Sequence, residues 1–117
     1  MNQSKGELYI EERLRDLDIN FEKQKRFEDC KNIKTLPFDF YVPQNNVCIE
    51  YDGEQHYKPI DFWGGEERFL ERQLNDKIKD EYCNKNNITL IRIPYTKTKQ
   101  EIIEIINNLM SPATITA

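Results

Sequence analysis

The stretch LPFDFYVPQNNVCIEYD, residues 36–52, contains two short apolar runs separated by the tetrapeptide PQNN. The aromatic and β-branched residues of the runs, 36–42 and 47–52, are typical of strands, and Pro and Asn favour a turn between them. The stretch therefore predicts a β-hairpin. Its unusual feature is that acidic residues stand inside the apolar strands.

Strand parity decides whether these acids meet. Side chains alternate between the two faces of a strand, so Glu50 and Asp52 share a face of the second strand. A two-residue turn within residues 44–46 makes the residue numbers of opposed pairs add to 89 or 91. Asp39 then lies opposite Glu50 or Asp52, and the three carboxylates form one patch. A three-residue turn would break this arrangement.

Such a patch needs an offsetting interaction, because two like charges about 5 Å apart repel by roughly 3 kcal/mol at an effective dielectric near 20. The offset can be a raised pKa, a basic neighbour or a bound hard divalent cation. Mg²⁺ suits clustered carboxylates, and it lowers the pKa of a bound water. A metal site formed by Asp39, Glu50 and, as a third candidate, Asp52 is therefore one prediction, beside a raised pKa or a basic neighbour. The alternative for each acid is a solvated position on the outer face of the hairpin.

His56 is the only histidine of the chain, and it lies four residues after Asp52. Because the unperturbed pKa of histidine is close to neutral, this side chain can act as a general acid or base. The alternative is a surface histidine, or one that is hydrogen-bonded within its own loop.

Hydrophobic periodicity predicts the rest of the chain. Ser4 and Glu7 fit the capping box of a first helix. The elements outside the hairpin are a helix at 4–17, an edge strand at 19–27, a helix at 66–86, a central strand at 88–95 and a helix at 98–110. We expect an α/β (α+β) fold in which a mixed sheet is flanked by helices, with a single domain over 1–110 and a disordered tail over 111–117.

Composition limits the class of protein. The chain has 117 residues, a formal net charge of −4 and three cysteines without a C-x-x-C pair, so neither a disulfide framework nor a zinc cage is expected. No apolar stretch is long enough for a membrane span or a secretory signal, which predicts a soluble cytoplasmic protein with no membrane partner. The negative charge argues against DNA as a partner unless basic side chains cluster locally.

The pattern D-x(10)-E-x-D-G-E-Q-H begins at Asp39 in the hairpin and ends at His56. Later in the chain it is followed by LNDKIKDEYCNKNNITLIRIPY. This combination resembles the PD-(D/E)XK nuclease superfamily, in the branch related to very-short-patch-repair endonucleases, which includes phage homing endonucleases with a Glu-Asp-His-Asp constellation. The resemblance covers about residues 4–95. It implies a restriction-endonuclease-like mixed sheet flanked by helices. It also implies Mg²⁺- or Mn²⁺-dependent hydrolysis of phosphodiester bonds in double-stranded DNA, as in the catalytic domain of a homing endonuclease.

The resemblance further implies the site residues. The positions that match the family's catalytic residues in type are Glu7, Asp39, Glu50, His56 and Asp76. Two features depart from the family pattern: Phe38 separates the proline of the first motif from Asp39, and Asp52 replaces the lysine that usually follows the strand acid. A lysine-dependent activation of water is therefore not expected, and His56 or the metal is the expected source of the nucleophile. The zinc site of the repair enzymes has no counterpart.

The side chains predicted to contact DNA are Lys25, Phe62, Trp63, Lys77 and Lys79. The lysines can pair with phosphates and the aromatic residues can wedge between base steps; the alternatives are a solvated charged face and packing in the core. No helix-turn-helix or zinc finger is apparent, so a long specific target implies a separate DNA-recognition domain. The alternative functions are a structure- or mismatch-selective nicking nuclease and a non-catalytic nucleic-acid-binding domain.

Overall fold

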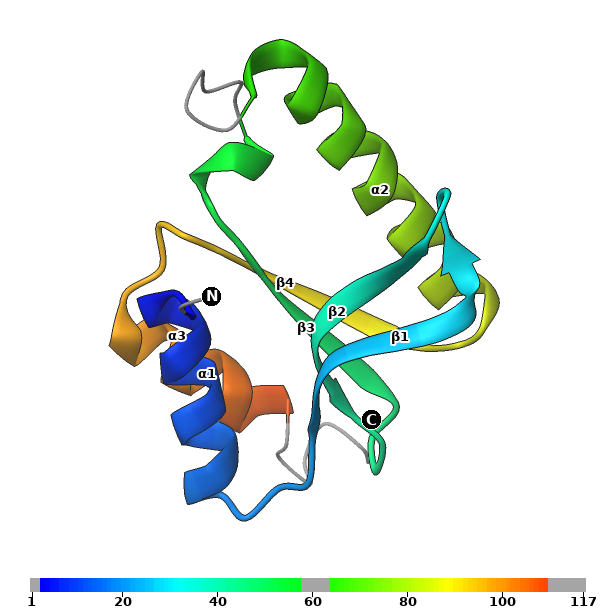
Figure 1. Cartoon of the computed structure of the whole chain (residues 1–117). Helices are drawn as coiled ribbons and strands as arrows, with labels where there is room; N and C mark the ends of the chain where they lie inside the picture. The colour runs from blue at the N-terminus through cyan, green and yellow to red at the C-terminus, as the bar shows by residue number, and fades with distance from the viewer. Residues whose placement is uncertain (1–2, 58–63, 110–117) are drawn as a thin grey trace. The chain divides into compact units, whose positions relative to one another are not determined.

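The computed structural model describes residues 3–57 and 64–109, which form an α+β arrangement of three α-helices and a four-stranded mixed sheet (Figure 1). The predicted fold class is confirmed. The elements are α1 (Lys5–Asp16), β1 (Glu22–Lys31), β2 (Thr35–Val42), β3 (Val47–Asp52), the 3₁₀ helix η1 (Glu54–His56), α2 (Gly65–Lys85), β4 (Thr89–Pro94) and α3 (Lys99–Leu109). Phe62, Trp63 and the predicted tail lie outside the described residues.

The chain falls into two compact units, a helical unit that contains α1 and α3 and a sheet unit that contains the four strands and α2. The single domain expected over 1–110 stays a prediction. No helix within the described ranges is long and apolar enough to cross a membrane.

In the helical unit, α1 begins at the predicted capping box. The Glu7 N–H donates to Oγ of Ser4 at 3.2 Å, and the same hydroxyl donates to Oε1 of Glu7 at 3.0 Å. Arg13 Nε donates to Oδ1 of Asn107 at 2.8 Å, which links α1 to α3. The fully buried apolar side chains of the two helices are Ile10, Leu14, Ile102 and Ile106.

In the sheet unit, the strand order is β1-β2-β3-β4, with two antiparallel pairs followed by a parallel pair. Strand β1 is an edge strand as predicted, but it extends to Lys31 rather than ending at residue 27. The central position expected for β4 is wrong, because this strand forms the other edge. The apolar run ITLIRIPY suggested two covered faces, yet Ile93 is fully buried while Leu90 and Ile91 are only half-buried.

The hairpin register follows the predicted odd sum. Opposed residues of β2 and β3 add to 89, as in the pairs Phe40–Ile49 and Val42–Val47. The connection is a four-residue turn, Pro43–Asn46, in which Asn46 takes the left-handed conformation (φ 54°) that asparagine tolerates. The turn is two residues longer than predicted. Since an even number of residues keeps the sum odd, the register is unchanged.

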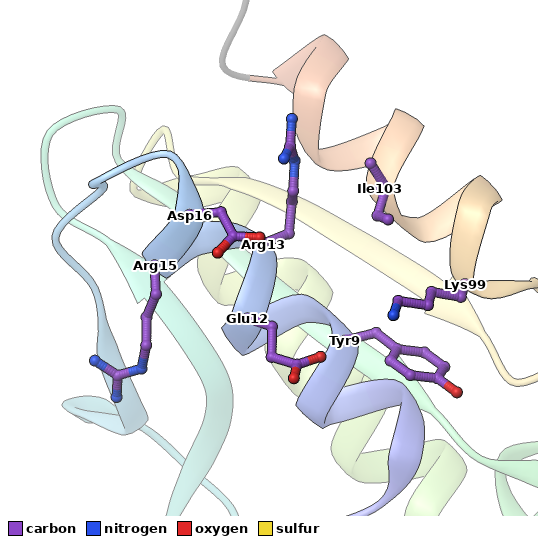
Figure 2. Close-up of a pocket in the computed structure, with 7 residues that line it drawn as sticks. All are labelled: Tyr9, Glu12, Arg13, Arg15, Asp16, Lys99 and Ile103. Atoms are coloured by element: carbon purple, nitrogen blue, oxygen red, sulfur yellow. The ribbon is translucent and has the colours of Figure 1, made fainter.

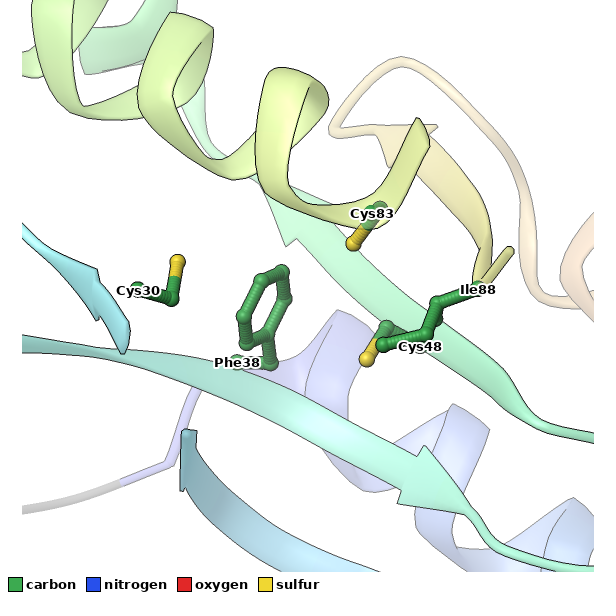
Figure 3. Close-up of a cluster of buried hydrophobic side chains, with 5 residues drawn as sticks. All are labelled: Cys30, Phe38, Cys48, Cys83 and Ile88. Atoms are coloured by element: carbon green, nitrogen blue, oxygen red, sulfur yellow. The ribbon is translucent and has the colours of Figure 1, made fainter. Parts of the chain in front are cut away.

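Helix α2 lies along one face of the sheet and covers an apolar cluster (Figures 1 and 3). The buried members of the cluster are Cys30, Phe38, Cys48, Cys83 and Ile88. Regular alternation would place Phe38 and Tyr41 on opposite faces, yet both rings contact that of Phe27, with centroids 5.7 and 5.3 Å apart. Strand β2 therefore departs from regular alternation between these two residues.

Candidate functional site

Hydrogen bonds join Asp39 of β2 to Glu50 and Tyr51 of β3, next to the Phe40–Ile49 pair of the hairpin ladder. The Asp39 N–H donates to Oε2 of Glu50 at 2.8 Å, and Oδ2 of Asp39 accepts the Tyr51 N–H at 2.8 Å. Side-chain-to-backbone hydrogen bonds thus continue the strand pairing beyond the Phe40–Ile49 pair. Each carboxylate is fixed by the backbone of the opposite strand.

Strand β1 is distorted at the position opposite Asp39. The pairs Lys23–Phe40 and Lys25–Phe38 place Gln24 opposite Asp39. Gln24 has a positive φ of 53°, which is uncommon for a residue other than glycine. Strain of this kind is often found at functional sites, because the surrounding structure must compensate for it.

Lys79 of α2 forms an ion pair with Oε1 of Glu50 in a buried setting. The two residues are 9% and 3% exposed. The Lys79 ammonium also lies 5.1 Å from the centroid of the Phe38 ring, within the range of a cation–π contact. The Lys79 side chain is buried and paired with Glu50, and the DNA contact expected for it stays a prediction.

His56 lies in η1, which Arg72 of α2 holds through a 3.2 Å hydrogen bond from Nε to the Gln55 carbonyl. The Nδ1 atom of His56 is 3.0 Å from Oδ2 of Asp76 and 3.8 Å from Oδ1 of Asp52. The hydrogen bond with Asp76 raises the pKa of His56 above its ordinary value, although burial opposes it. A histidine held in this way favours the protonated form.

Asp76 has the complementary shift. Burial alone would raise its pKa, but the hydrogen bond with His56 and the charge of Arg92 together lower it below the ordinary aspartate value. Both shifts favour the charged forms of the pair, and the two predicted catalytic residues are brought together.

Arg92 of β4 is a site residue that the sequence interpretation missed. Its Nη1 lies 3.4 Å from Oδ1 of Asp52 and 3.5 Å from Oδ1 of Asp76, and Nη2 donates to Oδ1 of Asp80 at 2.9 Å. Burial raises the pKa of Asp52, and the charge of Arg92 acts in the opposite direction. The signal in the sequence was a single charged residue inside the apolar run ITLIRIPY, since arginine is rarely buried without a partner.

Basic neighbours are thus the main offset to the repulsion among the acids. Lys79 pairs with Glu50, and Arg92 pairs with Asp52 and Asp76. A raised pKa contributes at Asp52. The repulsion is thus offset by groups that belong to the chain itself.

Carboxylate oxygens are the ligand type that Mg²⁺ and Mn²⁺ prefer. Within residues 3–57 and 64–109, no group of three or more His, Cys, Asp and Glu side chains is arranged to hold a metal ion. Mg²⁺ often uses only one or two carboxylates and completes its shell with water and substrate phosphate. Asp39 and Glu50 carry two carboxylates that hydrogen bonds hold between β2 and β3, and the contacts above do not fill the four or so acceptor positions of Glu50. The ligand role of Asp52, which is paired with Arg92, stays a prediction.

The other predicted residues lie outside this arrangement or at its surface. Glu7 belongs to the helical unit, where it completes the capping box, and its catalytic role stays a prediction. Lys25 pairs with Glu22 at 3.3 Å and is half-buried. Lys77 is exposed, as a phosphate contact requires.

A cavity of about 290 Å³ lies in the helical unit between α1 and α3 (Figure 2). The side chains that line it are Tyr9, Glu12, Arg13, Arg15, Asp16, Lys99 and Ile103. The lining mixes both signs of charge, and the Lys99 ammonium lies 5.3 Å from the Tyr9 ring centroid. Its surroundings do not select one class of ligand.

Comparison with known proteins gives relatives without an assigned activity. No family model and no solved structure matches the chain. The chain is 45% identical over 62 residues to uncharacterized protein 307L of Invertebrate iridescent virus 6, which is 52% of this chain and 32% of that protein. It is 36% identical over 62 residues to uncharacterized protein 033L of Invertebrate iridescent virus 3, with the same shares of 52% and 32%. It is 32% identical over 82 residues to uncharacterized protein 094L of Frog virus 3, which is 62% of this chain and 53% of that protein. The chain thus spans about a third to a half of the length of these relatives.

Proposed function

We propose that this chain is a Mg²⁺- or Mn²⁺-dependent endonuclease domain that hydrolyses phosphodiester bonds of double-stranded DNA. The observation that supports it most is that hydrogen bonds join Asp39 to Glu50 and Tyr51, while the His56–Asp76 pair adjoins Asp52, two residues after Glu50 on β3. Two hard oxygen ligands beside an acid–base pair are the groups that metal-assisted hydrolysis requires. The resemblance to the PD-(D/E)XK nucleases implies the same reaction.

Asp39 and Glu50 would hold and orient the cation. A bound Mg²⁺ or Mn²⁺ would supply a more acidic water and would stabilise negative charge on the phosphate. The N–H groups of Asp39 and Tyr51 keep both carboxylates in place, so little reorganisation is needed when substrate binds.

His56 would transfer the proton. Its Nδ1 is engaged by Asp76, so exchange with the substrate takes place through Nε2. Because the pKa of His56 is raised, the protonated form is favoured, and this suits donation of a proton to the leaving oxygen. Asp76 orients the ring and stabilises its charge.

The charge distribution also answers the objection from the net charge of −4. Lys79 and Arg92 pair with the acids, and His56 lies beside Asp76, so the charge of the site is mixed rather than purely negative. Exposed Lys77 on α2 can add a contact to the phosphate backbone.

The test is cleavage of a supercoiled plasmid. The wild type is assayed with Mg²⁺ and with EDTA, and the variants Asp39→Asn and His56→Gln are assayed with Mg²⁺. We expect the wild type to cleave the plasmid with Mg²⁺ but not with EDTA, and both variants to lose most of the cleavage activity. Glu28→Gln is the matched control, since Glu28 is an exposed acid on β1. Cleavage that persists in EDTA or in Asp39→Asn contradicts the proposal, and DNA binding without cleavage favours the non-catalytic alternative. Linear, mismatched and branched duplexes tested side by side distinguish a structure-selective enzyme.

A further inference from the structure

The buried ion pair between Lys79 and Glu50 has a consequence for metal binding. The two side chains are 11% and 4% exposed, and the Lys79 ammonium also contacts the Phe38 ring. Burial of either charge without its partner is strongly unfavourable, so the pair is maintained in the absence of other ligands. Glu50 is therefore already neutralised by a cation that belongs to the protein.

Glu50 is also one of the two carboxylates that the proposed function assigns to the metal. A divalent cation on Glu50 would repel the Lys79 ammonium across a few ångströms, in a place where solvent screens poorly. The cation can bind if it overcomes this repulsion or if the ammonium moves away. In either case Lys79 opposes metal binding, whereas Asp39 favours it.

We infer that Lys79 is a built-in counter-ion of Glu50 that makes metal binding by the free protein weak and dependent on substrate DNA. The inference rests on the proposed function. Phosphate oxygens of the substrate add ligands and negative charge, which offset the Lys79 ammonium. By linkage, the cation then increases the affinity for DNA by the same factor as DNA increases the affinity for the cation. Lys79 is a positioning residue, because it acts through Glu50.

The first test is calorimetric titration of Mn²⁺ into the protein without DNA. Lys79→Met removes the charge and keeps an unbranched apolar side chain, so the dissociation constant for Mn²⁺ should fall by about ten-fold or more. Lys79→Arg keeps the charge and should stay within about three-fold of the wild type. Lys85→Met, an exposed position of the same helix, should leave the constant unchanged. A purely structural role of Lys79 predicts the opposite result for Lys79→Met, namely weaker binding or none.

A second measurement uses the wild-type protein and does not depend on the folding of a variant. Titration with Mg²⁺ is followed through the ¹³Cε resonances of the lysines, with Lys79 assigned from its absence in Lys79→Arg. The Lys79 resonance should shift in step with Mg²⁺ binding, and that of Lys85 should not. Mg²⁺ binding that leaves the Lys79 resonance unmoved overturns the inference.

The outcomes separate this inference from the proposed function. If the wild type cleaves DNA with Mg²⁺ and Lys79→Met binds Mn²⁺ no more tightly than the wild type, the inference alone fails. If no variant binds Mn²⁺ and the wild type leaves plasmid uncut, both fail. Tighter Mn²⁺ binding by Lys79→Met together with a shifted Lys79 resonance supports the inference.

Discussion

The backbone N–H of Asp39 donates a 2.8 Å hydrogen bond to the carboxylate of Glu50 on the opposite strand. The other oxygen of Glu50 accepts from Lys79. Glu50 therefore joins β2, β3 and α2 through a single buried side chain. Changes to any of these partners should affect stability as well as chemistry.

Glu50→Gln should destabilise the fold by about 3 kcal/mol, because it leaves the Lys79 ammonium buried without a carboxylate. The double variant Glu50→Gln/Lys79→Met should recover part of this loss, since no unpaired charge remains. Denaturant unfolding of the wild type, both single variants and the double variant measures the coupling. Strictly additive free energies of unfolding would contradict the buried pair.

The His56–Asp76 pair should make stability depend on pH within a defined window. The pKa of His56 is raised, so its contribution is complete below about pH 6.5 and is lost as the pH rises through the folded value. The pKa of Asp76 is lowered, so its contribution is present above about pH 3.8 and is lost as the pH falls through the folded value. The pair should therefore stabilise most between these limits.

The measurement is the Tm of the wild type and of His56→Gln from pH 3 to pH 9. The difference in Tm should be largest between about pH 4 and pH 6.5 and should shrink toward pH 9. Asp52, whose Oδ1 is 3.8 Å from the His56 ring, acts in the same direction on the histidine. A difference in Tm that is constant across the range would contradict the account of this pair.

Arg92→Met should cost roughly 3 kcal/mol at pH 7, because Asp52 is 4% exposed and loses its cation. Without Arg92 the pKa of Asp52 rises further, so its protonated form is favoured in the folded state. The destabilisation should therefore decrease as the pH falls from 7 to 5. Urea unfolding at both pH values measures this destabilisation. The control is Arg68→Met, at an exposed position of α2. An equal cost at both pH values would show that Asp52 does not depend on Arg92.

Asn46→Ala should destabilise the hairpin by about 2 kcal/mol. Asn46 has a left-handed φ of 54°, accepts from the Tyr41 hydroxyl at 2.7 Å and donates to the Asn87 carbonyl at 3.0 Å. Alanine loses both hydrogen bonds and is strained at this φ. Gln44→Ala, at an exposed position of the same turn, should change the free energy of unfolding by less than about 0.5 kcal/mol. Equal effects of the two substitutions would contradict the role given to the turn.

The register of the hairpin could be predicted because it depends on local rules. An even turn length suffices to give the odd-sum register seen in the pairs Phe40–Ile49 and Val42–Val47, and the capping box of Ser4 and Glu7 is equally local. The position of β4 could not be predicted in this way. An apolar run indicates burial, but only the packing of the whole sheet decides between a central and an edge position.

The ion pairs of the site also could not be predicted from the sequence. Lys79 and Lys77 look alike as charges on a helix, and the packing of α2 on β3 buries one while the other stays exposed. The same packing leaves Leu70 and Leu74 at 56% and 50% exposure, although their spacing predicts a buried stripe. Periodicity predicts that the segment is helical, but it does not predict over what length the sheet packs against the helix.

Anomalous scattering of Mn²⁺ in crystals of the protein with a short DNA duplex would show where the metal binds. We expect a peak about 2.0–2.3 Å from an oxygen of Asp39 and an oxygen of Glu50, next to a phosphate. Asp39→Asn should lose the peak. A fully occupied Mn²⁺ site elsewhere on the protein, with Asp39 and Glu50 bound only to the backbone and to Lys79, would contradict the proposed metal site.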